Sequence, residues 1–197
     1  MTDTVAWQAA QVSELRYWDR WYGPALTREW HRGIAGLMQL DAREIADRSV
    51  IDVGCGPVSL MFDYPPARGV GLDPLDFGPE REAAYATRGL ARLLVPAEEI
   101  AEDLWRLDEA WCYNCLQHVI SPGAVLLTMT RLARGTIRIF EWIHEPVSEV
   151  HLHVLDPDLI ANHLRAGGWH PASEMTGTWR ARGITDLQFY AGLWRLA

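Results

Sequence analysis

The chain has 197 residues, of which 49% are hydrophobic and 22% charged, a composition typical of one globular domain. Its formal net charge of −8 argues against a broad nucleic-acid surface, because phosphate binding relies on clustered basic side chains. No uninterrupted apolar run reaches the roughly 18 residues of a membrane span, and three cysteines, an odd number, do not make a disulfide framework. We therefore expect a cytoplasmic protein without membrane contact.

The first 48 residues are expected to form a helical arm. Apolar residues recur near helical spacing from Val5 to Tyr22, and residues 26–38 resume the pattern after a break at Gly23-Pro24. Four aromatic residues suggest that this arm is a lid over a ligand site: Tyr17, Trp18, Trp21 and Tyr22. We predict one domain over residues 1–197, divided into this arm (1–48) and a sheet domain (49–197).

Short apolar runs after residue 48 predict strands, with helices between them. The strands are expected at residues 49–53, 69–72, 91–95, 110–113 and 136–142, with two more in the tail, of which 187–196 is the stronger. The helices are expected at residues 58–62, 80–90, 98–104, 121–132 and 156–165. This alternation indicates an α/β fold: a mainly parallel sheet of about seven strands with helices on both faces and an N-terminal helical cover.

Two of the predicted strand ends carry residues suited to nucleotide binding. Residues 54–56 (Gly-Cys-Gly) follow the first strand and allow the backbone to approach a ligand closely. Asp73 follows the second strand, where a carboxylate can accept hydrogen bonds from both hydroxyls of a ribose, and Leu72 and Pro74 would flank an adenine. A dinucleotide fingerprint would place a third glycine at Ser59, which argues against a nicotinamide oxidoreductase.

Three segments resemble one enzyme family. Residues 50–56 (Val-Ile-Asp-Val-Gly-Cys-Gly) resemble the first motif of the Rossmann-like (class I) S-adenosylmethionine-dependent methyltransferases, and residues 71–73 (Gly-Leu-Asp) resemble the second. Residues 107–119 are similar to the fourth-strand segment of the small-molecule branch. The resemblance covers residues 49 to about 145 and implies S-adenosylmethionine as cofactor and methyl transfer to a small molecule. The Asn/Asp-Pro-Pro-Tyr signature of nucleic-acid amine methylation is absent.

The resemblance also implies a set of cofactor-binding residues. Gly54 and Gly56 would line the methionine part of the cofactor, and Asp73 would hold the ribose. The family's third-strand acid falls near Pro96, so the neighbouring residues 97 and 98 are the expected substitutes for an adenine contact. The full set is Asp52, which would shape the loop, with Gly54, Cys55, Gly56, Leu72, Asp73, Pro74, Ala97, Glu98, and Cys112, Tyr113 and Asn114 facing the sulfonium end.

The sequence suggests three catalytic candidates, although in-line methyl displacement does not require a base. Histidine titrates near neutrality and can remove a proton from the acceptor, which makes His144 and His118 candidates beside Glu141. Ordinary surface histidines remain the competing interpretation. Cys112, Cys115 and His118 are residues of the types that bind zinc. Structural zinc uses four ligands, however, and the sequence has no second pair of closely spaced cysteines. No metal is therefore expected.

Two other classes of function stay open at this point. The imperfect third motif is compatible with a non-catalytic S-adenosylmethionine-binding protein, such as an inactive partner subunit. A nicotinamide oxidoreductase on a similar sheet is the second class. A thermal shift with S-adenosylmethionine or with NAD separates them, because a ligand of the folded state raises the unfolding midpoint.

Overall fold

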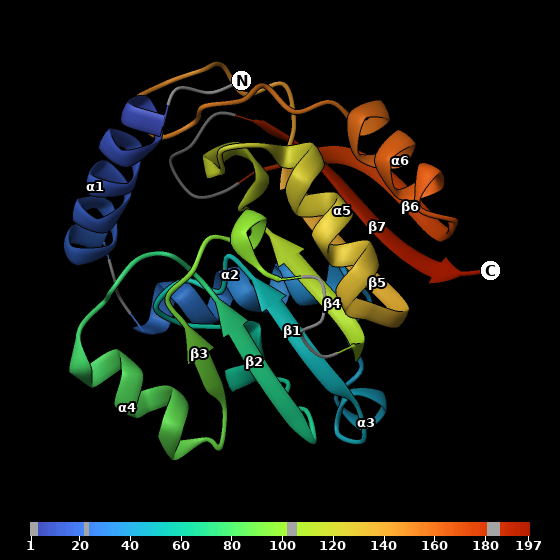
Figure 1. Ribbon diagram of the computed structural model, residues 1–197, viewed down its shortest axis with the longest axis horizontal. Helices are drawn as coiled ribbons and strands as arrows, with labels where there is room; N and C mark the ends of the chain where they lie inside the picture. The colour runs from blue at the N-terminus through green and yellow to red at the C-terminus, as the bar shows by residue number, and fades with distance from the viewer. Residues whose placement is uncertain (1–3, 22–23, 102–105, 181–185) are drawn as a thin grey trace.

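A seven-stranded sheet forms the centre of the protein (Figure 1). The computed structural model describes residues 4–21, 24–101, 106–180 and 186–197. The strand order is β3-β2-β1-β4-β5-β7-β6. The first five strands in this order are parallel, whereas β7 runs antiparallel to β5 and β6 antiparallel to β7. The predicted mainly parallel α/β sheet is confirmed.

The elements follow the predicted order closely. The strands are β1 (Ser49–Val53), β2 (Arg68–Leu72), β3 (Ala91–Leu93), β4 (Leu107–Tyr113), β5 (Ala133–Trp142), β6 (Trp169–Trp179) and β7 (Leu187–Leu196). The α-helices are α1 (Thr4–Trp21), α2 (Pro24–Leu37), α3 (Ala42–Ile45), α4 (Pro79–Thr87), α5 (Pro122–Leu132) and α6 (Pro157–Ala166). Three short 3₁₀ helices are η1 (Leu60–Phe62), η2 (Ala97–Glu99) and η3 (Leu116–His118). The helix predicted over 98–104 is only the turn η2, and residues 102–105 lie outside the described residues.

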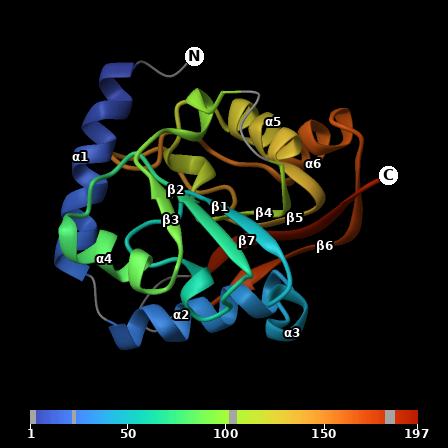
Figure 2. The ribbon, with the colours of Figure 1, turned by 60° about the horizontal axis from the view of Figure 1, so that its bottom comes forward.

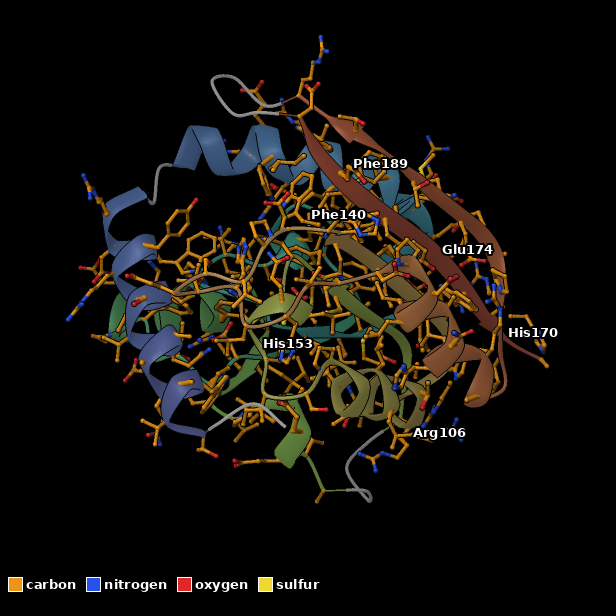
Figure 3. All side chains as sticks on the ribbon, turned by 90° about the horizontal axis from the view of Figure 1, so that it is seen from above. Arg106, Phe140, His153, His170, Glu174 and Phe189 are labelled. Carbon is orange, nitrogen blue, oxygen red and sulfur yellow. The ribbon has the colours of Figure 1, made fainter. Side chains whose placement is uncertain are left out.

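The alternating side chains of the central strands divide the core into two layers. On β1, Ile51 and Val53 belong to the core under α5 and α6, whereas Val50 belongs to the core under α2. Figure 2 shows α2 and α3 on one side of the sheet and α5 and α6 on the other. Phe140 and Phe189, labelled in Figure 3, stack with ring centroids 5.7 Å apart in the α2 layer. Because β1 is covered on both faces, its side chains are mostly apolar, and its one buried carboxyl group, Asp52, is hydrogen-bonded.

One buried ion pair joins the sheet to the end of α2. Arg138 on β5 is 1% exposed, and its Nε donates to the carboxylate of Glu109 on β4 at 2.8 Å. Its Nη1 donates to the backbone carbonyls of Met38 and Gln39, at 2.9 and 2.6 Å. The indole of Trp111 also donates to Glu109, at 3.0 Å. The buried guanidinium therefore binds the Glu109 carboxylate and the two backbone carbonyls that follow α2.

The helix α1 lies apart from both layers. In Figures 1 and 2 it stands at one side of the molecule, away from α5 and α6. One face of it lines a cleft with residues that follow β1, β2 and β4. Among the described helices, none is long and apolar enough to cross a membrane. The position of α1 matters because the predicted functional residues lie at the strand ends that it covers.

Candidate cofactor-binding site

A narrow cleft lies between α1 and the carboxyl ends of the parallel strands. The hollow spans about 610 Å³ with its open mouth included, and its accessible interior is about 70 Å³. Nine of the residues predicted from the sequence line it: Gly54, Gly56, Leu72, Asp73, Pro74, Ala97, Glu98, Asn114 and His118. The fold thus brings together residues from four separate segments of the chain.

The glycine turn after β1 is fixed directly to the carboxylate after β2. The backbone N–H of Gly56 donates to Oδ2 of Asp73 at 2.9 Å. Gly54 and Gly56 have φ angles of 71° and 59°, in the left-handed region that favours glycine. A Cβ at residue 54 would overlap the Sγ of Cys115. The glycines are therefore required by the conformation of the turn and by the packing of Cys115, and the two predicted places are adjacent.

The carboxylate of Asp73 lines the cleft and can accept further hydrogen bonds. It is 7% exposed, its Oδ2 accepts from Gly56, and its Oδ1 accepts from the N–H of Leu75 at 2.9 Å. Burial raises the pKa of Asp73 to about 6, against the opposing effects of these hydrogen bonds and of Arg92, whose Nη2 lies 3.9 Å away. Each carboxylate oxygen has about two lone-pair sites, so positions remain for two hydroxyl donors.

A buried network supports the turn from beneath. Asp52 accepts hydrogen bonds from Ser59 at 2.5 Å and from the hydroxyl of Tyr113 at 3.0 Å, and the backbone N–H of Leu60 donates to that same hydroxyl. Burial raises the pKa of Asp52 to about 7. Ser59, which replaces the third glycine of a dinucleotide fingerprint, thus ties the chain after the turn to β1. Asp52 shapes the loop without lining the cleft.

No protein-family model and no curated protein sequence matches the chain, but solved structures do. The 1,6-didemethyltoxoflavin N1-methyltransferase of Burkholderia thailandensis, with bound 1,6-didemethyltoxoflavin and S-adenosylhomocysteine, is 17% identical, with a TM-score of 0.74 over 100% of this chain and 92% of that chain. Magnesium protoporphyrin IX methyltransferase from Synechocystis PCC 6803, with bound S-adenosylmethionine, is 15% identical, with a TM-score of 0.70 over 95% and 97%.

The chain has the Rossmann-like fold of the class I S-adenosylmethionine-dependent methyltransferases. A third structure with this fold, the [4+2]-cyclase SpnF, is 15% identical, with a TM-score of 0.65 over 85% of this chain and 80% of that chain. At these identities the likeness establishes the fold, and the reaction has to be argued from the site.

Within this methyltransferase fold, three predicted contact residues lie behind the cleft. Cys55 is buried on the α2 side, where a Cβ at Gly71 would come within 2.6 Å of its Sγ. Cys112 and Tyr113 are buried inside β4, with their side chains in the two core layers. The cleft begins only where the strand ends, so Asn114 and the unpredicted Cys115 line it instead. Among the described residues, no three His, Cys, Asp or Glu side chains gather as a metal site would require.

Glu98 lines the cleft but already has a structural partner. Its Oε1 accepts from the backbone N–H groups of Ile120 and Ser121, at 3.0 and 3.1 Å. These donors precede α5, whose N-cap is Ser121. The carboxylate therefore fixes the start of α5 through Oε1, and Oε2 can accept from other donors. Ala97, which is 7% exposed, contributes an apolar wall beside it.

The three catalytic candidates lie in different environments. His144 is exposed with a φ of 60° and is not among the residues that line the cleft. Glu141 is buried behind the chain that follows β4, where it accepts from the N–H groups of Cys115 and Leu116 at 3.1 Å. Burial raises the pKa of Glu141 to about 7. The geometry makes Glu141 a support for this part of the cleft wall rather than a group in contact with a ligand.

His118 is the one of these three candidates that lines the cleft. Its Nδ1 lies 3.0 Å from the carbonyl oxygen of Val150, which can only accept, so Nδ1 carries the proton. Its Nε2 then accepts from the amide of Gln117, at 3.3 Å. Burial lowers the pKa of His118 to about 4. The imidazole is therefore neutral near pH 7 and has both nitrogens engaged.

Sequence reasoning missed most of the wall that α1 contributes. Trp7, Gln11, Glu14 and Trp18 line the cleft. Their spacing of four, three and four residues places them on one face of the helix, and this spacing is the signal that could have found them. Of the predicted lid residues, Trp18 lies in this wall and Tyr17 is 52% exposed. The side chain of Trp21 and the whole of Tyr22 lie outside the described residues.

Because several carboxyl groups are buried, we expect the stability of the protein to decrease as the pH rises through neutrality. Burial raises the pKa values of Glu14, Asp52 and Glu141 to about 7 each, from ordinary values near 4. The folded protein therefore binds more protons than the unfolded chain between these values, and the stability from this source is lost as the pH rises through 7. The buried histidines, with lowered pKa values, act in the opposite direction as the pH rises through about 6.5, the ordinary histidine value, and offset part of this loss.

We therefore expect the free energy of unfolding to fall by about 1 kcal/mol between pH 6.5 and pH 8. Urea denaturation of the ligand-free protein at these two values measures it. A free energy that stays constant or rises over this window would contradict the burial of these carboxyl groups.

Proposed function

We propose that this protein binds S-adenosylmethionine in the cleft and transfers its methyl group to a small-molecule acceptor. The observation that carries the proposal is the 2.9 Å hydrogen bond between the Gly56 N–H and Asp73. It joins a glycine turn after one strand to a ribose-type carboxylate after the next, at the strand ends where parallel α/β sheets bind ligands.

Each wall of the cleft has a distinct part in this proposal. Asp73 would accept hydrogen bonds from the two ribose hydroxyls, and Leu72 and Pro74 would flank the adenine, as would Ala97 from the opposite side. Gly54 and Gly56 allow the methionine part to lie against the backbone. When bound, the cofactor supplies an electrophilic methyl group. The protein's contribution is to hold an acceptor in line with that group and to exclude water.

The helix α1 acts in this proposal as a lid, with residues 1–48 as a cover and 49–197 as the cofactor-binding sheet domain. A Cβ at Gly56 would lie 3.7 Å from the indole of Trp18, so the helix reaches the glycine turn itself. Aromatic faces attract cations, which suits a sulfonium ligand. Because the accessible interior is only about 70 Å³, we expect α1 to move outward when a ligand enters.

The proposed acceptor is a small molecule. The net charge of −8 disfavours nucleic acid, and the two methyltransferases described above act on, or are solved with, small heterocyclic molecules. All three cysteines are free and buried, which supports a reducing compartment such as the cytoplasm.

The alternative is a protein that binds the cofactor without transferring its methyl group. The imperfect third motif keeps it open, but structures with this fold and bound S-adenosylmethionine or S-adenosylhomocysteine are methyltransferases. Incubation with methyl-labelled S-adenosylmethionine and a panel of phenols, amines, small acids and RNA decides between the two. Label transfer to a small molecule supports the proposal. Tight binding without transfer to any of them supports the alternative, and a thermal response to NAD alone contradicts both.

A further inference from the structure

Glu14 is the charged residue of the α1 wall, and it faces the cleft. Its side chain is 16% exposed, and its Oε2 lies 3.6 Å from Nδ1 of His118 on η3. The indole of Trp18, one turn further along α1, hydrogen-bonds to it. Asp73 lies close enough for the charge of Glu14 to raise its pKa. Glu14 therefore sits opposite the glycine turn and the ribose-type carboxylate.

The groups around Glu14 are neutral or acidic. His118 is neutral near pH 7, because burial lowers its pKa to about 4, and the Trp18 indole carries no charge. The other titratable groups that face it are Asp73 after β2 and Tyr17 on α1 itself. The described residues that line the cleft include no arginine. A carboxylate that is shielded from water without a cationic partner is costly, so this position favours a ligand that brings positive charge.

The chemistry of the proposed cofactor supplies that charge in the matching place. In S-adenosylmethionine the sulfonium sulfur is bonded to the ribose C5′ on one side and to the methionine chain on the other. With the ribose at Asp73 and the methionine part at Gly54 and Gly56, the sulfonium lies between these contacts, under α1. S-adenosylhomocysteine, the product of methyl transfer, has the same shape there but a neutral sulfur.

We propose that Glu14 recognises the positive charge of the sulfonium, so that the α1 lid binds S-adenosylmethionine in preference to S-adenosylhomocysteine. This inference rests on the proposed function. After methyl transfer Glu14 faces a neutral sulfur again, and its desolvation favours opening of α1 and release of the product. The charge of the ligand thereby sets the position of the lid.

The test compares the affinities of the two ligands in the wild type and in Glu14→Gln, by calorimetric titration at pH 6 and pH 8. The amide keeps the shape of the side chain and removes its charge. The ratio of the two affinities is the decisive quantity, because the ribose contact with Asp73 is the same in both ligands and cancels. Asp73 also gains charge over this range, and its effect on the sulfonium persists in Glu14→Gln, so the change that the variant removes is the part due to Glu14. Burial raises the pKa of Glu14 to about 7, so the wild-type preference for S-adenosylmethionine should grow from pH 6 to pH 8.

In Glu14→Gln we expect the preference for S-adenosylmethionine to fall by about tenfold at pH 8 and to grow less from pH 6 to pH 8 than it does in the wild type. Affinity for S-adenosylhomocysteine should stay within about twofold. The matched control is Asp19→Asn, which removes the same charge from the exposed face of α1 and should leave the ratio unchanged. Equal weakening of both ligands in Glu14→Gln, or an unchanged ratio, overturns the inference but not the proposed function. Failure of the wild type to bind either ligand overturns the proposed function itself.

Discussion

Replacing Asp73 by alanine should lower the affinity for S-adenosylhomocysteine by about a hundredfold. The substitution removes the acceptor of two ribose hydroxyl groups, and a hydrogen bond to a charged group contributes about 1.5–3 kcal/mol. It also leaves the N–H groups of Gly56 and Leu75 without their acceptor, which loosens the glycine turn. Isothermal titration calorimetry measures the loss, and Asp47→Ala, at an exposed carboxylate, is the control for the change in net charge.

A second ligand separates loss of ribose recognition from damage to the fold. An analogue of S-adenosylhomocysteine without the two ribose hydroxyls should bind the wild type weakly and Asp73→Ala about equally weakly. If Asp73→Ala still preferred the hydroxylated ligand as strongly as the wild type does, Asp73 would not hold the ribose. Circular dichroism of the variant verifies that the chain is folded.

Replacing Arg138 by methionine should reduce the free energy of unfolding by about 3–5 kcal/mol. The change leaves the buried Glu109 carboxylate without its cation and the carbonyls of Met38 and Gln39 without this donor. Arg180→Met is the surface control: Arg180 pairs with Asp186, and its side chain is 83% exposed, so its loss should matter by less than about 1 kcal/mol.

The double variant Arg138→Met with Glu109→Met sharpens this test. Because the buried carboxylate is removed as well, it should be more stable than Arg138→Met alone. Urea denaturation measures all three variants. An Arg138→Met protein with unchanged stability, or a double variant less stable than the single one, would show that the pair does not hold α2 to the sheet.

Much of the architecture follows from local sequence signals. The β-branched run at 49–53 predicts a buried strand, and β1 is indeed covered on both faces. Ser121 and Asp156 were expected to begin helices, and their side chains accept from the N–H groups of Ala124 and Asp158. The glycine turn and Asp73 were expected to converge, because the carboxyl ends of parallel strands meet at one edge of the sheet.

The remaining features depend on contacts between distant segments, which a sequence pattern does not encode. Arg138 lies between two isoleucines of β5, and its burial is explained only by Glu109 and by the end of α2. Cys112 and Tyr113 were predicted to face the cofactor, but both lie inside β4. The residue at which β4 ends decides which side chains reach the cleft, and those are Asn114 and Cys115. Glu14 was not predicted, because its place in the cleft wall depends on the packing of α1 against His118 and the strand ends.

The most direct test of the account is a crystal structure of the protein with S-adenosylhomocysteine. We expect the ribose hydroxyls within hydrogen-bond distance of Asp73, the amino-acid part against Gly54 and Gly56, and α1 over the sulfur with Glu14 facing it. Binding at another place on the protein, or a cleft that stays closed by Trp18 at saturating ligand concentration, would contradict the central claim that these strand ends hold an adenosyl cofactor.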